Sequence, residues 1–187
     1  MSAQSINWVI LPGLPGTGPD ARQFSLPGGS THREGLVLEF HPQPGESWVA
    51  NFQRGSTITD GVWLHPDEHQ LLVIAGGQGY LFDSASKSVV EYFGGWITIV
   101  IPASSQGTVL FGDGRGFWGF SNGHAWESRP ISRSKVRNLR LSGPTLTGEA
   151  WAYHAIDRER WLAFELDIDT GRHCGGDPYA HVLPSRD

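Results

Sequence analysis

The chain has little cysteine, no long apolar run and no excess of basic charge. Cys174 is the only cysteine in 187 residues, so an internal disulfide is impossible, and a single thiol favours a reducing compartment. Met1 to Ser5 carry no side-chain positive charge, so we expect no signal peptide. No apolar run approaches the roughly 20 residues of a membrane span. The sequence therefore predicts a cytoplasmic protein without a membrane partner.

The charge balance argues against nucleic acid as a partner. Fourteen basic and nineteen acidic side chains give a formal charge of −5, which repels a phosphate backbone. One basic stretch runs against this balance, formed by Arg133, Lys135, Arg137 and Arg140. The first three would share one face of a strand, and we interpret the stretch as a solvated strand face.

Glycine, proline and aromatic residues are abundant. The 25 glycines and 12 prolines interrupt helices, and glycine supplies the positive φ angles of tight hairpins. Eight tryptophans and nine phenylalanines suit a pleated, half-buried surface. These counts predict an all-β protein.

Turn residues divide the chain into repeated antiparallel hairpins. Residues 1–34 form a Pro/Gly-rich segment without a long regular element, and residues 35–60 form a first hairpin. Repeat-like β units follow at 61–93, 96–128 and 136–176. We expect residues 1–187 to form a single domain.

The spacing of the repeats narrows the architecture. The third strands of the three units end at Asp83, Ser121 and Asp167, which lie 38 and 46 residues apart. Such intervals are typical of four-stranded propeller blades. The sequence predicts a propeller-like arrangement or a curved meander, and a two-sheet sandwich is the alternative.

Three stretches, at residues 71–83, 146–151 and 161–167, carry a resemblance. The sequence resembles small, uncharacterised bacterial all-β proteins with propeller-blade-like hairpin repeats. This group has no assigned activity, so the resemblance implies a bacterial, cytoplasmic origin and assigns no functional residue.

No motif predicts catalysis or a cofactor. His173 and Cys174 are adjacent, so in a strand they point to opposite faces and cannot form a thiol and base pair. The glycine clusters at 76–79 and 112–116 lead into aromatic strands, whereas a phosphate loop precedes a helix. We predict no catalytic residue and no cofactor.

The densest group of possible metal ligands lies at His65 and His69, with Asp67 and Glu68 between them. Pro66 makes this segment a turn, and the sequence identifies no third or fourth ligand. An exposed acidic turn is the favoured interpretation, and a metal site at His65 and His69 is the alternative.

Tryptophans near turns are the candidates for a binding surface. Trp63, Trp118 and Trp126 flank predicted turns, and aromatic side chains on a rigid β scaffold often anchor partners. The competing role is to fill the space between sheets. Together with Asp67 and Glu68, these tryptophans form the predicted partner-binding set.

The favoured function is a non-catalytic domain that binds another protein. Its specific form is a bacterial immunity protein of antitoxin type, whose acidic surface occludes a toxin. The alternative is a carbohydrate-binding or small-ligand-binding module, or an enzyme, with a tryptophan-lined groove. A third hypothesis is a structural or oligomerising unit.

Overall fold

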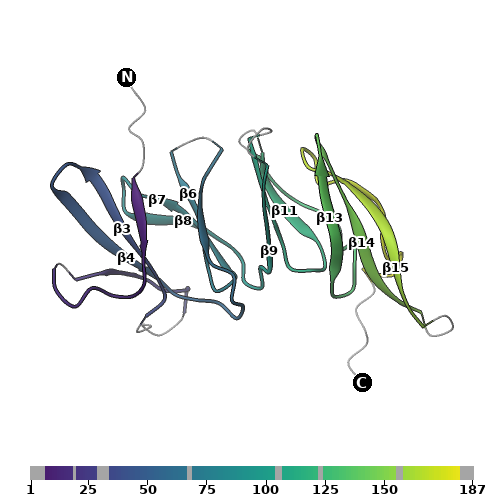
Figure 1. Cartoon of the computed structure of the whole chain (residues 1–187), viewed down its shortest axis with the longest axis horizontal. Coiled ribbons are helices and arrows are strands. Elements are labelled where there is room, and N and C mark those ends of the chain that lie inside the picture. The colour runs from purple at the N-terminus through teal and green to yellow at the C-terminus, as the bar shows by residue number, and fades with distance from the viewer. Residues whose placement is uncertain are drawn as a thin grey trace. The chain divides into compact units, whose positions relative to one another are not determined.

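The computed structural model describes residues 7–18, 20–28, 34–66, 69–103, 107–121, 124–154 and 158–181 (Figure 1). In these ranges the regular structure consists of strands, arranged in four small four-stranded sheets. This confirms the all-β class and the hairpin architecture. Within the same ranges, no helix has the length and apolarity to cross a membrane.

The chain divides into two compact units, residues 1–97 and 98–187. Each unit contains two of the four sheets and its own buried apolar cluster. The two units are described separately below, and the single-domain organisation stays a prediction.

The first sheet of unit 1 is built around the predicted first hairpin. In spatial order its strands are β1 (Trp8–Leu11), β3 (Leu36–Gln43), β4 (Glu46–Phe52) and β2 (Arg22–Phe24). The Pro/Gly-rich N-terminal segment contributes both edge strands, of four and three residues. β2 pairs with β4 in parallel, and the other pairs are antiparallel.

The second sheet of unit 1 is an antiparallel meander in chain order. Its strands are β5 (Gly61–Leu64), β6 (Leu71–Ala75), β7 (Gln78–Asp83) and β8 (Ser88–Gly94). Gly76 and Gly77 connect β6 to β7 with φ angles of 54° and 80°. A two-residue hairpin loop with a type I′ turn requires positive φ at both positions, which glycine adopts without steric cost.

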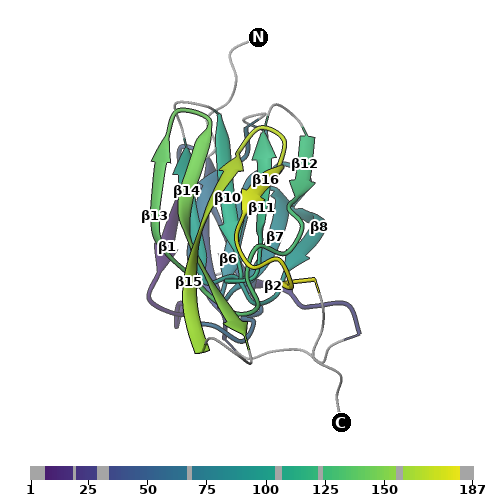
Figure 2. The same cartoon turned by 90° about the vertical axis from the view of Figure 1, so that its right-hand side faces the viewer.

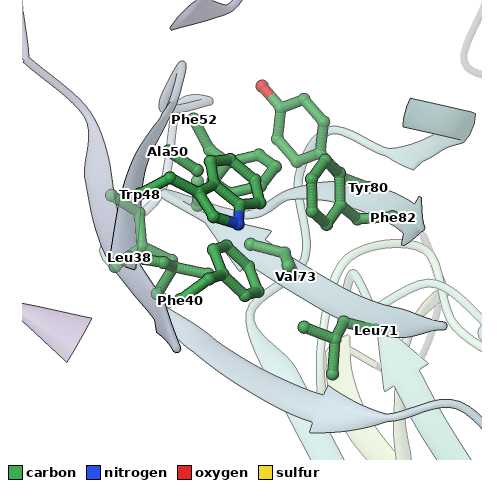
Figure 3. Packing of buried hydrophobic residues seen from close by; sticks show 11 residues of the cluster. Leu38, Phe40, Trp48, Ala50, Phe52, Leu71, Val73, Tyr80 and Phe82 are labelled. Atoms are coloured by element: carbon green, nitrogen blue, oxygen red, sulfur yellow. The ribbon is translucent and has the colours of Figure 1, made fainter. Parts of the chain in front are cut away.

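The core of unit 1 lies between these two sheets because alternate residues of their central strands face each other (Figure 3). It contains Leu36, Leu38 and Phe40 of β3, Trp48, Ala50 and Phe52 of β4, Leu71, Val73 and Ala75 of β6, and Tyr80 and Phe82 of β7. The Phe82 ring lies 5.0 to 6.1 Å, centroid to centroid, from four other aromatic rings. This ring is the centre of the aromatic packing.

Unit 2 repeats the arrangement with two antiparallel sheets (Figure 2). One contains β9 (Ile99–Ala103), β10 (Thr108–Gly112), β11 (Phe117–Ser121) and β12 (His124–Glu127). The other contains β13 (Val136–Ser142), β14 (Thr145–His154), β15 (Arg158–Asp167) and β16 (His173–Gly175). Residues from both sheets, among them Leu110, Phe117, Leu146 and Phe164, form its core.

The edge strands β12 and β16 of the two sheets in unit 2 come close together (Figure 2). The Trp126 ring of β12 lies directly against Gly171, in the turn before β16, and against Gly119 of the neighbouring strand β11. A side chain at either glycine would collide with the indole. This contact brings the end of β12 next to the turn that precedes β16.

One strand begins later than the sequence predicts. The apolar run from residue 96 predicts a strand from Trp96 onward, whereas β9 begins at Ile99. The N–H groups of Gly95 and Ile97 both bond the carbonyl of Gly77, at 3.2 and 3.0 Å. These bonds hold the preceding segment against the β6–β7 turn, so it cannot extend β9.

Candidate functional site

The three tryptophans predicted to bind a partner are all half-buried. Trp63, on β5, lies over Gly61 of its own strand. Trp126 packs against the core of unit 2, and its indole N–H has no hydrogen-bond partner among the described residues. Trp118, on β11, lines a small hollow of about 150 Å³. The partner-binding role of these side chains stays a prediction.

The acidic turn of the predicted set lies outside the described residues, because Asp67 and Glu68 are not described. Of the two flanking histidines, His65 is buried and His69 is exposed. In the described part of the chain, no group of three or more His, Cys, Asp or Glu side chains could hold a metal ion. The described residues therefore supply no third ligand for a metal ion bound by His65 and His69.

The most exposed large apolar side chains lie elsewhere in unit 1. Ile58 is 97% exposed, and Trp96 is 66% exposed. Thr57 precedes Ile58 and Ile97 follows Trp96 in the chain. The hydroxyl of Thr57 donates a 2.8 Å hydrogen bond to the carbonyl of Ile97, so the two segments are in direct contact. Ile58 and Trp96 thus protrude from adjacent segments, and we call them the apolar pair.

Sequence reasoning missed the apolar pair, although each residue carries a signal. Ile58 is the single apolar residue in the polar stretch from Ser56 to Asp60. Trp96 follows Gly94 and Gly95, which mark a connection rather than a strand interior. A large apolar side chain inside a connection has no covered sheet face to occupy.

The loop that carries Ile58, residues 53–60, is fixed to the β6–β7 turn. Its backbone bonds to that turn are Gly55 N to Ala75 O (2.9 Å), Thr57 N to Gly76 O (2.8 Å) and Gly77 N to Thr59 O (2.9 Å). Asp60 accepts a 2.7 Å bond from the Gly76 N–H and forms a 2.6 Å ion pair with Arg54. Ile58 is therefore displayed on an ordered base.

Unit 2 contains a groove between the end of β12 and the turn before β16. We call it the arginine groove, and it is lined by Glu127, Arg129, Thr170, Gly171, Arg172 and His173. Its volume is about 430 Å³. Within the described residues, Arg129 and Arg172 make no ion pair. The groove is thus lined by two guanidinium groups and one carboxylate, none of which forms an ion pair within the described residues.

The electrostatics of the groove act on His173. Burial and repulsion by the Arg129 guanidinium, in that order, lower the pKa of His173 below its ordinary value of 6.5. Its neighbour Cys174 is exposed. The imidazole is therefore mainly neutral at pH 7 and can donate a hydrogen bond from one nitrogen while it accepts at the other.

The small hollow beside Trp118 adjoins the groove through Glu127, which lines both. Asp113 and Arg115 also line it, and the Arg115 Nε atom is buried without a hydrogen-bond partner in the described ranges. At about 150 Å³, the hollow is smaller than the roughly 300 to 1,000 Å³ of typical ligand pockets. It gives little support to a carbohydrate stacked on Trp118.

Three side chains of the basic stretch interact with other side chains of the same protein. Arg133 pairs with Asp177 at 3.1 Å, and Arg137 pairs with Glu149 at 2.7 Å. Lys135 and Arg137 also lie over the rings of Trp151 and Trp161. β13 begins only at Val136, so the prediction that the first three cations share one strand face is wrong.

The physical cause is a turn before β13. The single hydroxyl hydrogen of Ser132 is shared between the carbonyls of Lys135 and Trp151, whose oxygens lie 2.7 and 3.0 Å from the hydroxyl oxygen. The same oxygen accepts from the N–H groups of Ser134 and Lys135. These bonds give residues 132–134 a turn, and Lys135, whose carbonyl accepts from the Trp151 N–H at 3.0 Å, comes directly before β13.

Comparisons with known proteins identify no family for this chain. No protein-family model and no curated protein matches it. A chain in the solved structure described as "Crystal structure of the eukaryotic initiation factor" is 14% identical, with a TM-score of 0.38. The match covers 76% of this chain and 40% of that chain. A similarity this weak has no bearing on function.

Proposed function

We propose that the protein is a non-catalytic domain that binds another protein through the apolar pair, Ile58 and Trp96. The observation that supports this is the 97% exposure of Ile58 on a loop held by hydrogen bonds. An isolated surface isoleucine is ordinary. An almost fully exposed isoleucine and a mostly exposed tryptophan, carried by two segments that are hydrogen-bonded to each other, can serve together as an interface anchor.

The shape of the pair favours a protein over a small ligand. Small molecules bind in concave sites that cover most of their surface. Ile58 is almost fully exposed, so it can be covered only by a partner that supplies the socket. An ordered loop also loses little conformational entropy on binding, which leaves more of the hydrophobic free energy for affinity.

The partner we propose is a basic protein with an apolar socket. The chain carries a formal charge of −5, and opposite charge speeds association and fixes orientation. The specific form of the proposal is an immunity protein that occludes a toxin. Its support is the acidic charge and the resemblance to small bacterial hairpin-repeat proteins.

The experiment compares variants of the full chain by affinity purification from the native host. Ile58→Asp and Trp96→Ala should each weaken capture of one stoichiometric partner at least tenfold, because an anchor contributes about 2 kcal/mol or more. Val90→Asp is the matched control, since Val90 is 54% exposed on β8. Equal loss in all three variants, or no stoichiometric partner, would overturn the proposal.

The immunity form has a test of its own. Co-expression with the product of a neighbouring gene should protect cells with the wild-type protein and fail to protect them with Ile58→Asp. Protection that is unchanged in Ile58→Asp would exclude the apolar pair as the toxin-binding surface.

A further inference from the structure

The arginine groove of unit 2 shares no residue with the apolar pair and calls for a separate explanation. We propose that it is a binding site for the oxyanion group of a small molecule, a phosphate or a carboxylate, held between Arg129 and Arg172. This function goes beyond protein binding and does not depend on it.

The first argument is charge. The chain as a whole is acidic, and three of its described arginines, Arg54, Arg133 and Arg137, form ion pairs. Arg129 and Arg172 form none within the described residues, yet they line the same groove. Two guanidinium groups that line one groove attract an oxyanion into it. The planar fork of arginine also matches the paired oxygens of phosphate and carboxylate.

The second argument is preorganisation of the turn that carries Arg172. The Asp167 carboxylate accepts from the N–H groups of Asp169 and Thr170, at 3.0 and 2.9 Å. The Asp167 carbonyl accepts from the Gly171 N–H at 2.9 Å, and the Arg172 carbonyl accepts from the Asp167 N–H at 2.9 Å. The turn is therefore closed by its own hydrogen bonds, and binding need not order it.

The third argument is packing beneath the groove. Gly171 has a φ of +70°, a conformation that favours glycine. It also lies against the Trp126 ring, which leaves no room for a side chain. The floor of the groove is thus fixed to the unit 2 core. The Arg129 guanidinium lines the same groove and is close enough to His173 to disfavour its protonated form.

Glu127 determines which anions the groove accepts. Its carboxylate lines the groove and, within the described ranges, makes no ion pair. It repels a bound anion and reduces affinity, and it can accept a hydrogen bond from a hydroxyl of the ligand. A phosphate dianion gains more from two arginines than a single carboxylate does, so phosphorylated, hydroxyl-bearing molecules fit the site best.

The test measures binding of inorganic phosphate and of acetate to the full chain by NMR titration at low ionic strength and pH 7. Chemical-shift changes should centre on Thr170, Gly171 and His173. Saturation with phosphate assigns the phosphate class, and saturation with acetate alone assigns the carboxylate class. The absence of saturable shifts at these positions with either anion would overturn the proposal.

Charge variants separate a built site from general attraction. Arg129→Ala and Arg172→Ala should each weaken anion binding at least tenfold. Arg140→Ala, which removes an exposed arginine on β13 outside the groove, should change it less than twofold. An equal loss of anion affinity in all three variants would mean that the anion is held by general charge attraction, which would contradict the proposal.

Glu127→Gln makes the test independent of folding defects. Removal of the repelling carboxylate should tighten anion binding severalfold, and a misfolded variant cannot gain affinity. Unchanged or weaker binding in Glu127→Gln would show that the anion does not occupy the arginine groove.

Discussion

Thr57 and Ile97 are joined by a 2.8 Å hydrogen bond from the threonine hydroxyl to the isoleucine carbonyl. They are 40 residues apart in the chain. Thr57 directly precedes Ile58, and Ile97 directly follows Trp96. The bond joins the 53–60 loop to the segment that carries Trp96. The hydroxyl also accepts from the Thr59 N–H at 3.2 Å. One side chain therefore holds both supports of the proposed interface.

Thr57→Val should loosen this support. The substitution removes one donor and one acceptor, and we expect the free energy of unfolding to fall by about 1 to 2 kcal/mol. The Thr59 amide should exchange its hydrogen faster, which hydrogen-exchange NMR measures. Thr57→Ser keeps the hydroxyl and should retain slow exchange. Equal exchange at Thr59 in the valine and serine variants would contradict the role of the hydroxyl.

Phe82→Ala should open a cavity at the centre of unit 1. Phe82 contacts the rings of Phe24, Phe40, Trp48 and Phe52. Loss of a buried phenylalanine costs about 3 to 5 kcal/mol of stability, which urea unfolding would measure.

The matched control for the cavity is Val90→Ala, which truncates an exposed side chain on β8. It should change stability by less than about 0.5 kcal/mol. Similar losses in Val90→Ala and Phe82→Ala would contradict the central place of the Phe82 ring.

Gly119→Ala should displace the Trp126 ring. The added methyl group would occupy the space of the indole, and overpacking of this kind costs about 1 to 3 kcal/mol. Near-ultraviolet circular dichroism and urea unfolding would report the change. Gly16→Ala is the control, because apart from its chain neighbours no described atom lies within 4 Å of the added carbon, and it should leave both signals unchanged.

The stability of the protein should depend on the protonation of His173. The pKa of this imidazole in the folded chain lies below 6.5, so the unfolded chain binds the proton more tightly. The contribution of His173 to the free energy of unfolding is complete above pH 6.5 and falls as the pH decreases toward the folded pKa. Comparison of urea unfolding at pH 7.5 and 5.5 tests this.

Two variants isolate the His173 effect from other titrating groups. His173→Asn should lose less stability between pH 7.5 and 5.5 than the wild-type protein. Arg129→Gln should raise the pKa of His173 toward 6.5 because it removes the repelling charge, and an NMR titration of the imidazole would show it. If wild type and His173→Asn lose the same stability, His173 makes no contribution.

The sequence alone could not locate most of the surfaces proposed here for binding. Trp63, Trp118 and Trp126 are near turns, as predicted, but exposure depends on what covers each sheet face. Trp126 illustrates this, since its ring is covered by the turn at Gly171, which is distant in the sequence. The apolar run that begins at Trp96 predicts a strand there, whereas the bonds of Gly95 and Ile97 to Gly77 place Trp96 outside the strand.

The sequence by itself determined the class of the protein: strands and hairpins, without helices in the described residues. Alternation such as Leu36, Leu38 and Phe40, and turn residues such as Gly76 and Gly77, act over a few neighbouring positions, so they can be interpreted without tertiary structure. Only the tertiary structure decided which side chains protrude and which charges meet. Ile58 and Trp96, like Arg129 and Arg172, come from distant segments, and only the pairing and packing of sheets bring those segments together.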